Sequence, residues 1–258
     1  MEYLRAFSSE LVKIRRTWAF TLSVVTPVGV TLFIFLVMME APKKEWNDVW
    51  ISYLRGVVWS WLLMVTPLYV ALLLALLAST DHDAGTWKLL LAQPVSRPPL
   101  YVAKLTVGLL LVAWSQVVLA ASCLGIGFLV PKLRPELGNY KPGVNVPHLL
   151  AMLSLAYVAG LLMTAIHTWL SMRSANFVLS LAVVIFAETA NILGMQQESL
   201  QKWWPWLFPF DVVRLLGLQP WDTVQHFWSI QHLMLLSLLG AAVVTALALR
   251  GFNRREVA

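Results

Sequence analysis

Residues 80–104 read TDHDAGTWKLLLAQPVSRPPLYVAK and separate two long apolar runs, residues 57–78 and 105–130. A helix that crosses the ~30 Å hydrocarbon core of a bilayer needs ~20 mostly apolar residues, and each run is long enough. The connecting segment carries acids, bases and prolines, so we expect it to lie outside the hydrocarbon. The two runs and their connection therefore predict an integral membrane protein.

The rest of the chain extends this pattern. Further apolar runs of spanning length occupy residues 18–39, 149–170, 177–195 and 233–249. Hydrophobic residues make up 59% of the chain and charged residues 12%, whereas soluble domains are about 45–50% apolar and about 25% charged. The sequence predicts an all-α integral membrane protein, with residues 1–258 forming a single domain of six transmembrane helices.

The distribution of basic residues predicts the orientation of the chain. With six spans the two termini share a side, and the segments on that side are the shorter ones and carry more Lys and Arg. The positive-inside rule then places both termini in the cytoplasm. We expect a multi-pass protein of the cell (inner) membrane.

Two segments outside the spans have their own patterns. Residues 1–16 predict an amphipathic helix at the inner interface. Its apolar positions recur every three or four residues at Leu4, Phe7, Leu11 and Ile14, and Trp18 continues this spacing into the first span. This helix is either a simple topology anchor or an elbow that braces a moving neighbour. Residues 196–231 are too broken by prolines to span, yet strongly apolar, and predict one or two short helices that dip into the outer leaflet.

The segment 80–104 predicts a short cytoplasmic helix. Asp81 or Asp83 can cap a helix that begins near Gly85 and Thr86, and Pro94 ends it. Trp87, Leu90 and Leu91 would form an apolar cluster on this helix, and Lys88 lies among them in sequence. Arg97 and Lys104 can hold the returning chain at the lipid head groups or on a partner's carboxylate. The alternative is a surface loop that only reverses the chain.

The pattern D-x-x-x-G-T-W-K-L-L-L-x-x-P-V-S-R from Asp81, followed by Lys104, resembles the permease subunits of ABC-2-type transporters. It is most similar to the branch of bacitracin-resistance and lantibiotic-immunity permeases, in which the acidic residue is commonly Glu. The resemblance covers the layout of the whole chain, but only about 25 residues at the level of letters. It implies that residues 80–104 contain a coupling helix that docks on an ATPase.

The resemblance also implies partners. The chain has no G-x-x-x-x-G-K-[ST] phosphate-binding loop, so we expect no cofactor in this chain and no enzymatic activity of its own. ATP and Mg would be bound by a separate ABC ATPase subunit, in two copies. A second permease chain, identical or a sister subunit, would complete the transporter among membrane lipids. The sequence offers no basic pattern for nucleic acid.

Glu188 is the one acidic residue deep within a predicted span, and Asn191 lies on the same helix face. Counting ~1.5 Å per residue from the turn at residues 172–175 places Glu188 ~20 Å deep and Tyr157 ~22 Å deep. Tyr157 rather than His167 is then the expected neighbour of Glu188, with Thr164 on the same face as Tyr157. These residues either line a substrate path or dimer seam, or hold helices together by hydrogen bonds.

These patterns favour an ATP-driven exporter of an amphipathic or hydrophobic cargo, such as a peptide antibiotic or a lipid-like molecule. Two other functions remain open: a membrane anchor or relay of an ATPase complex that moves no cargo, and an intramembrane lipid-modifying enzyme. His82 lies between Asp81 and Asp83, but three neighbouring residues cannot converge on one ion, so we expect no metal site.

Overall fold

The computed structural model describes residues 2–14, 17–40, 48–83, 97–137, 146–174, 177–194, 203–217 and 227–253, and these ranges are helical apart from short connections. The larger helices are α1 (Glu2–Ile14), α2 (Trp18–Glu40), α3 (Val49–Ser60), α4 (Thr66–Asp83), α6 (Arg97–Gly127), α8 (Val146–Ala159), α9 (Leu161–Arg173), α10 (Phe177–Gly194), α12 (Phe208–Leu216) and α13 (Phe227–Asn253). Shorter turns are the π-helical η1 (Trp61–Val65), α7 (Val130–Leu133) and the 3-10 turn η2 (Pro135–Leu137).

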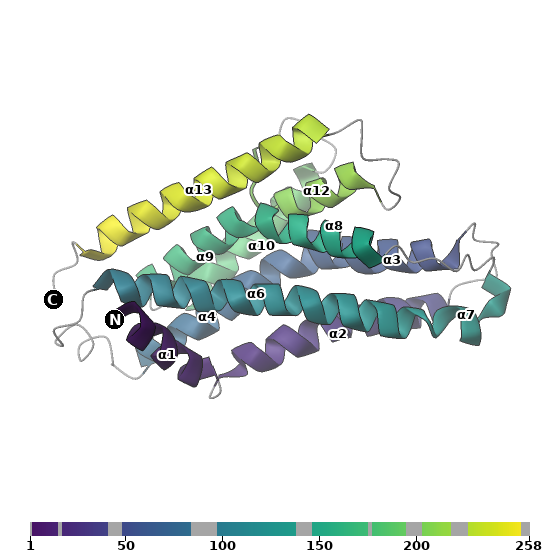
Figure 1. Ribbon diagram of the computed structural model, residues 1–258, viewed down its shortest axis with the longest axis horizontal. Helices are drawn as coiled ribbons and strands as arrows, with labels where there is room; N and C mark the ends of the chain where they lie inside the picture. The colour runs from purple at the N-terminus through teal and green to yellow at the C-terminus, as the bar shows by residue number, and fades with distance from the viewer. Residues whose placement is uncertain are drawn as a thin grey trace.

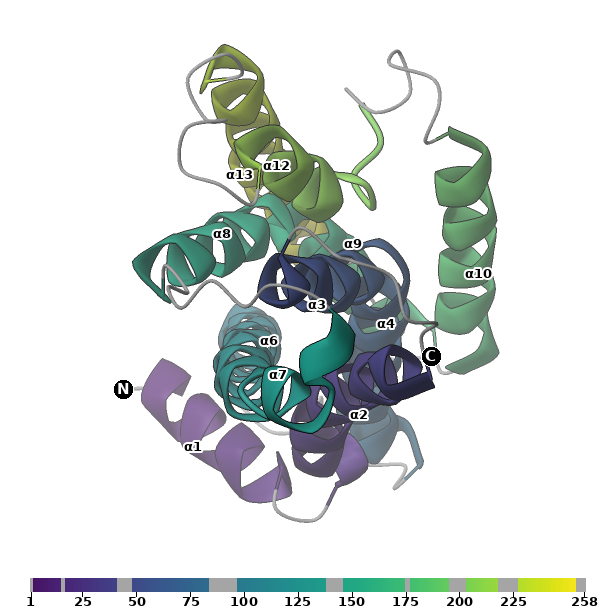
Figure 2. The same cartoon turned by 90° about the vertical axis from the view of Figure 1, so that its right-hand side faces the viewer.

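The helices form an elongated bundle with both chain termini at the same end (Figure 1). Helix α6 packs against α1 and α2, and α13 packs against α9. Helix α10 packs against α4 and α9, on the opposite side of the bundle from α1 (Figure 2). The short helix α12 packs against α8 near the end of the bundle away from the termini (Figure 1).

Within the described residues, four stretches are long and apolar enough to cross a membrane: Trp18–Glu40, Val49–Ser79, Pro98–Leu133 and Ser229–Gly251. The pair α8 and α9 makes a fifth if its two halves, bent by 44°, form one broken span. Helix α10 is apolar but has only 18 residues, roughly 27 Å, slightly less than the ~30 Å hydrocarbon core. The described residues therefore support a multi-pass membrane protein with four or five candidate spans, and the six predicted spans stay a prediction.

The second span is longer than its predicted run, residues 57–78, because helix extends it at both ends. Asp48 starts α3 by accepting hydrogen bonds from the N–H groups of Trp50 (2.9 Å) and Ile51 (3.2 Å). The π-helical turn η1 closes with the N–H of Thr66 bonded to the carbonyl of Trp61. Pro67 follows directly and has no N–H to donate to the preceding turn, so the wider turn lies where a regular helix would lose a bond.

The fourth predicted span, residues 149–170, is broken at Gly160, which the sequence analysis did not anticipate. A side chain of α13 bridges the break: the Ser237 hydroxyl accepts from the N–H of Leu162 (3.1 Å) and lies 3.0 Å from the carbonyl oxygen of Val158. These two backbone groups would bond directly in a continuous helix. The same hydroxyl lies 2.8 Å from the carbonyl oxygen of Ala159, so its single proton is shared between the Ala159 and Val158 carbonyls while its oxygen accepts from Leu162. The inserted hydroxyl therefore bonds the backbone on both sides of the break and holds the bend.

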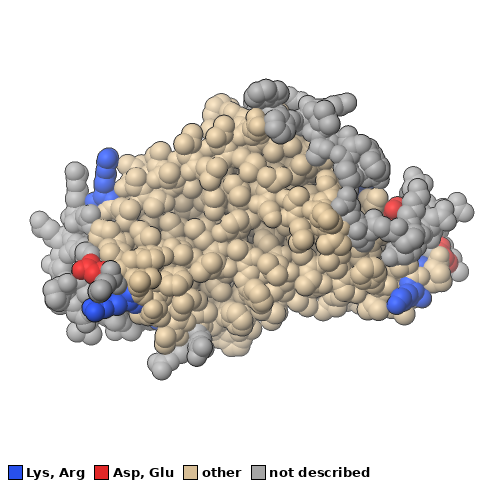
Figure 3. Space-filling view, in the orientation of Figure 1, with Lys and Arg blue, Asp and Glu red and all other residues tan. Residues whose placement is uncertain are grey.

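The surface shows how the bundle meets its surroundings. On the face drawn in Figure 3, the coloured charged side chains lie near the two ends, and the middle is uncharged. Large apolar side chains such as Phe33, Phe186 and Leu239 are more than 60% exposed along the helices. An uncharged middle with exposed apolar side chains is the surface that a bilayer requires.

Candidate functional site at the helix ends flanking residues 84–96

The predicted coupling segment lies mostly outside the described residues. Among its proposed site residues, those from Gly85 to Pro94 (Gly85, Thr86, Trp87, Lys88, Leu90, Leu91 and Pro94) are not described. Helix α4 continues to Asp83, so Asp81 and Asp83 belong to its last turn, and Arg97 is the first residue of α6. Helix α4 thus continues five residues beyond Ala78, the predicted end of the second span, into the predicted cytoplasmic segment.

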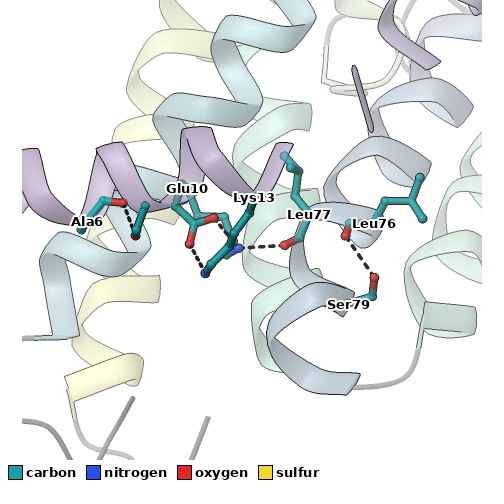
Figure 4. A network of polar contacts seen from close by, with 8 residues as sticks. Ala6, Glu10, Lys13, Leu76, Leu77 and Ser79 are labelled. Carbon is teal, nitrogen blue, oxygen red and sulfur yellow. Dashed lines mark hydrogen bonds and ion pairs between the residues drawn. The ribbon is translucent and has the colours of Figure 1, made fainter. Parts of the chain in front are cut away.

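The two helix ends that flank residues 84–96 lie at the same end of the bundle as both termini (Figure 1). Helix α1 runs along this end and packs against α6. The residues joining α1, α4 and α6 here form a small polar network (Figure 4).

Lys104 is the centre of this network. Its ammonium group lies 2.7 Å from Glu10 Oε2 and donates a second bond of 2.7 Å to the carbonyl oxygen of Leu77. The Lys104 and Glu10 side chains are only 3% and 4% exposed. The other oxygen of Glu10, Oε1, lies 2.6 Å from Nζ of Lys13, whose side chain is 31% exposed. One buried ion pair therefore joins three helices, and a second, more exposed cation completes the carboxylate.

Lys104 was expected at the head groups or on a partner's carboxylate. The structure places it instead in the interior, on a carboxylate of its own chain. Glu10 is not among the residues predicted from the sequence, because an acid in an amphipathic interfacial helix is usually solvated. A usable signal is the spacing of Ala6, Glu10 and Ile14, which recur every four residues and are the buried positions of α1.

The rest of α1 is exposed and mixed in character, with an apolar strip beside polar residues that include Arg5, Ser8 and Ser9. Leu4, Leu11 and Val12 are exposed, as is Trp18 at the start of α2. Of the predicted apolar stripe, Ile14 is buried against the bundle, whereas Leu4, Leu11 and Trp18 face outward. The protein-facing side of α1 is thus narrow and carries the carboxylate, and the apolar side is left for another environment.

A small apolar cluster lies at the same helix ends. Ala78 of α4 and Tyr101 of α6 are buried together with Met172 of α9 and Ala248 of α13. One turn further into the bundle from Lys104, α4 and α6 approach closely: a Cβ on Gly108 would lie 2.5 Å from a methyl carbon of Leu74. Both flanks of residues 84–96 are therefore packed against the rest of the bundle.

In the second group of candidate residues, Glu188 and Asn191 lie together on one helix face, whereas Tyr157 and Thr164 have other partners. Tyr157 donates its hydroxyl to the carbonyl oxygen of Leu109 in α6 (3.2 Å), and Thr164 donates to its own helix at Gly160. Glu188 has a different partner from the expected one, since Nδ2 of Asn191 lies 3.4 Å from its Oε2. Among the described residues, Glu188 Oε1 is buried without a hydrogen-bond partner.

Two tryptophans tie the chain after α10 to this region. Trp204 donates its indole N–H to Asn191 Oδ1 (2.8 Å), and Trp206 donates to His167 Nε2 (3.1 Å). An indole nitrogen only donates, so Nε2 of His167 must accept, and its proton is on Nδ1, 3.2 Å from Ser180 Oγ. His167 is thus a fully bonded neutral residue, separate from Glu188.

A comparison with protein families identifies the class of the chain. The model of the family described as "ABC-2 family transporter protein" matches residues 6–191. The chain belongs to the ABC-2 transporter family. No curated protein matches it.

The ABC-2 match begins within α1 and includes Glu10, Lys104 and both flanks of residues 84–96. It ends at Asn191, so the bridging tryptophans, α12 and α13 lie beyond it. An ABC-2 permease is the transmembrane component of an ABC transporter and is not itself catalytic. Its family normally works with an ATPase partner.

Proposed function

We propose that this ABC-2 protein is the permease subunit of an ATP-driven exporter that moves an amphipathic or hydrophobic cargo outward. A separate ABC ATPase, present in two copies, would bind ATP and Mg and hydrolyse the nucleotide. A second permease chain, identical or a sister subunit, would complete the assembly. The similarity of residues 81–97 to bacitracin-resistance and lantibiotic-immunity permeases supports a peptide antibiotic or lipid-like cargo.

The observation that carries this proposal is the placement of the flanks of residues 84–96. Both flanks lie at the same end as the two termini and pack firmly against α1, α9 and α13. An ATPase bound to residues 84–96 would therefore act on helix ends that are connected to most of the bundle. The exposed apolar face of α1 suits a helix at the inner membrane interface, which supports cytoplasmic termini in a six-span protein of the cell membrane.

Co-purification tests the partner. The full chain carrying an affinity tag is expected to retain an ATPase subunit from native membranes, and alanine substitutions at Trp87 and Leu90 are expected to abolish this association. Substituting Leu133, an exposed apolar residue at the other end of the bundle, is the matched control. Retention of the ATPase by the doubly substituted chain would refute the docking role of residues 84–96.

Transport of labelled amphipathic peptides and lipids into inside-out vesicles then tests the exporter. ATP-dependent accumulation supports export, whereas ATP hydrolysis without accumulation of any cargo tested would favour a relay subunit. The Glu188 pair of variants tests the substrate path: Glu188→Gln keeps a polar group of the same shape, and Glu188→Leu removes it. We expect Glu188→Leu to reduce transport more than Glu188→Gln, and unchanged transport in both would remove Glu188 from the path.

A further inference from the structure

We propose that Glu10 and Lys104 are positioning residues that tie the helix ends flanking residues 84–96 to α1, so that α1, α4 and α6 move as one body. This inference rests on the proposed function, in which residues 84–96 receive the motion of an ATPase. It adds the route by which that motion reaches the N-terminal helix.

Three helices share the buried ammonium of Lys104. Lys104 of α6 contacts the carboxylate of Glu10 in α1 and the backbone carbonyl of Leu77 in α4, each at 2.7 Å. Both side chains are almost fully buried. Water cannot replace either partner without opening the interface. Separating α1 from α6 would take the buried ammonium away from its carboxylate, and moving α4 away would remove a carbonyl acceptor from the same ammonium.

The contact of Lys104 with Leu77 lies close in sequence to both flanks of residues 84–96. Lys104 lies seven residues after Arg97, the first residue of α6, and Leu77 lies six residues before Asp83, the last residue of α4. At ~1.5 Å per residue these separations are ~10 Å and ~9 Å. The ion pair therefore holds each flank within two helical turns of the point where residues 84–96 begin or end.

The helices are also closely packed next to the ion pair. The close approach of α4 and α6 at Gly108 and Leu74 leaves no space for the two helices to shift toward one another. The hydroxyl of Tyr3 donates to Thr106 Oγ1 (3.2 Å), which adds a second contact between α1 and α6. The charge contact therefore acts on helices whose relative positions are already restricted.

A force on residues 84–96 would consequently move α1 together with α4 and α6. Because the exposed apolar face of α1 is turned away from the bundle, this motion would displace α1 relative to its surroundings rather than relative to α6. In this arrangement α1 is a driven part of the transporter, which favours a moving elbow over a static anchor.

Spin labels at Ser8 of α1 and Ser79 of α4 test the proposal in the full chain. Ser8 is exposed and Ser79 is partly exposed, and the one native cysteine, the buried Cys123, is replaced by alanine. The chain is reconstituted in nanodiscs, alone and with its ATPase, and the distance distribution is measured without nucleotide and after trapping with ATP and vanadate. The test variant is Glu10→Met combined with Lys104→Met, which removes both charges and keeps similar volumes.

Lys13→Met is the matched control, because it removes a cationic partner of Glu10 but leaves the contact of Lys104 with Glu10 and Leu77 between the three helices. In the unmodified chain and in Lys13→Met we expect one narrow distribution that nucleotide does not change. In the double variant we expect a broader distribution that shifts on trapping. A distribution in the double variant that stays as narrow and as unresponsive as in the unmodified chain would overturn the proposal.

The two proposals can fail separately. If no ATPase associates with the chain, the proposed function fails, while the measurement without nucleotide still decides whether the ion pair holds α1 to α4. If the ATPase associates and hydrolyses ATP but the Ser8–Ser79 distance of the unmodified chain changes on trapping, the single-body inference fails and the proposed function stands.

Discussion

Replacing Lys104 by methionine removes a buried ammonium from between α1, α4 and α6, and replacing Glu10 by methionine removes its carboxylate partner. The two changes delete opposite halves of one ion pair, but they leave different groups behind. Lys104→Met leaves Glu10 with Lys13 at 2.6 Å. Glu10→Met removes the buried carboxylate that lies 2.7 Å from the Lys104 ammonium and leaves its contact with the neutral carbonyl of Leu77 in place.

The magnitudes follow from what remains buried. Removing one partner of a buried pair destabilises a protein by about 3–5 kcal/mol, because the other charge stays unpaired. Glu10→Met is expected at the upper end, about 4–5 kcal/mol, since it takes the carboxylate at 2.7 Å away from an ammonium whose side chain is only 3% exposed. Lys104→Met is expected at about 2–3 kcal/mol, because Lys13 still pairs with Glu10.

The double variant separates charge from packing. A buried ion pair replaced by apolar residues of similar volume is often neutral or stabilising. Glu10→Met with Lys104→Met is therefore expected within about 1 kcal/mol of the unmodified chain, far less than the sum of the single losses. Lys13→Met, at a side chain 31% exposed, is expected to change stability by about 1 kcal/mol or less.

The assay is reversible unfolding of the purified chain in mixed detergent micelles, titrated with sodium dodecyl sulfate and followed by tryptophan fluorescence. The order of the free energies of unfolding is the decisive result. A double variant as unstable as the sum of the two singles would show that the charges contribute independently. A Lys104→Met variant less stable than Glu10→Met would show that Lys13 does not support the remaining carboxylate. Either result would refute the reasoning.

Two further predictions concern other parts of the fold. A Cβ at Gly127 would lie 2.0 Å from the ring of Trp50, whereas a Cβ at Gly125 would meet nothing within 4 Å. In thermal melts, Gly127→Ala should therefore destabilise the folded chain by about 1–3 kcal/mol. Gly125→Ala is the control and should leave the stability unchanged. Burial raises the pKa of Asp211 from 3.8 to about 6, despite the nearby Arg214. The folded chain then keeps a proton that the unfolded chain releases, so stability should fall as pH rises from 4 to 6, and Asp211→Asn should flatten this part of a melting-temperature profile.

Apolar run length predicted where helices form, since a hydrocarbon environment leaves few alternatives to a helix. It did not predict how they are interrupted. The break at Gly160 is maintained by Ser237, which is distant in sequence and whose hydroxyl has no pattern that distinguishes it from an ordinary buried serine. Span ends were also missed where polar residues continue a helix, as Asp81 and Asp83 do in α4.

In the candidate site, too, the sequence predicted individual residues but not their tertiary partners. Lys104 was selected from its place at the mouth of a span, but its partner was not, because pairing between α1 and α6 depends on tertiary contact. Tyr157 was chosen as the neighbour of Glu188 by depth alone. Depth along an axis does not fix which helix is adjacent, and α10 packs against α4 and α9, while Tyr157 bonds to α6.

The two ends of the bundle are held by contacts of different kinds. At the end with the termini, a buried ion pair joins α1, α4 and α6. Beyond α10, the described contacts that tie residues 203–207 to α9 and α10 include two neutral hydrogen bonds, from Trp206 and Trp204, and a neutral hydrogen bond contributes only about 0.5–1.5 kcal/mol. Trp206 and Leu207 are also buried, and the Trp206 ring packs edge-on against His167 with centroids 6.0 Å apart, so apolar burial adds to these two hydrogen bonds. The contacts differ in kind: opening those around Trp204 and Trp206 exposes apolar surface and neutral groups, whereas separating Lys104 from Glu10 takes a buried ammonium away from its carboxylate.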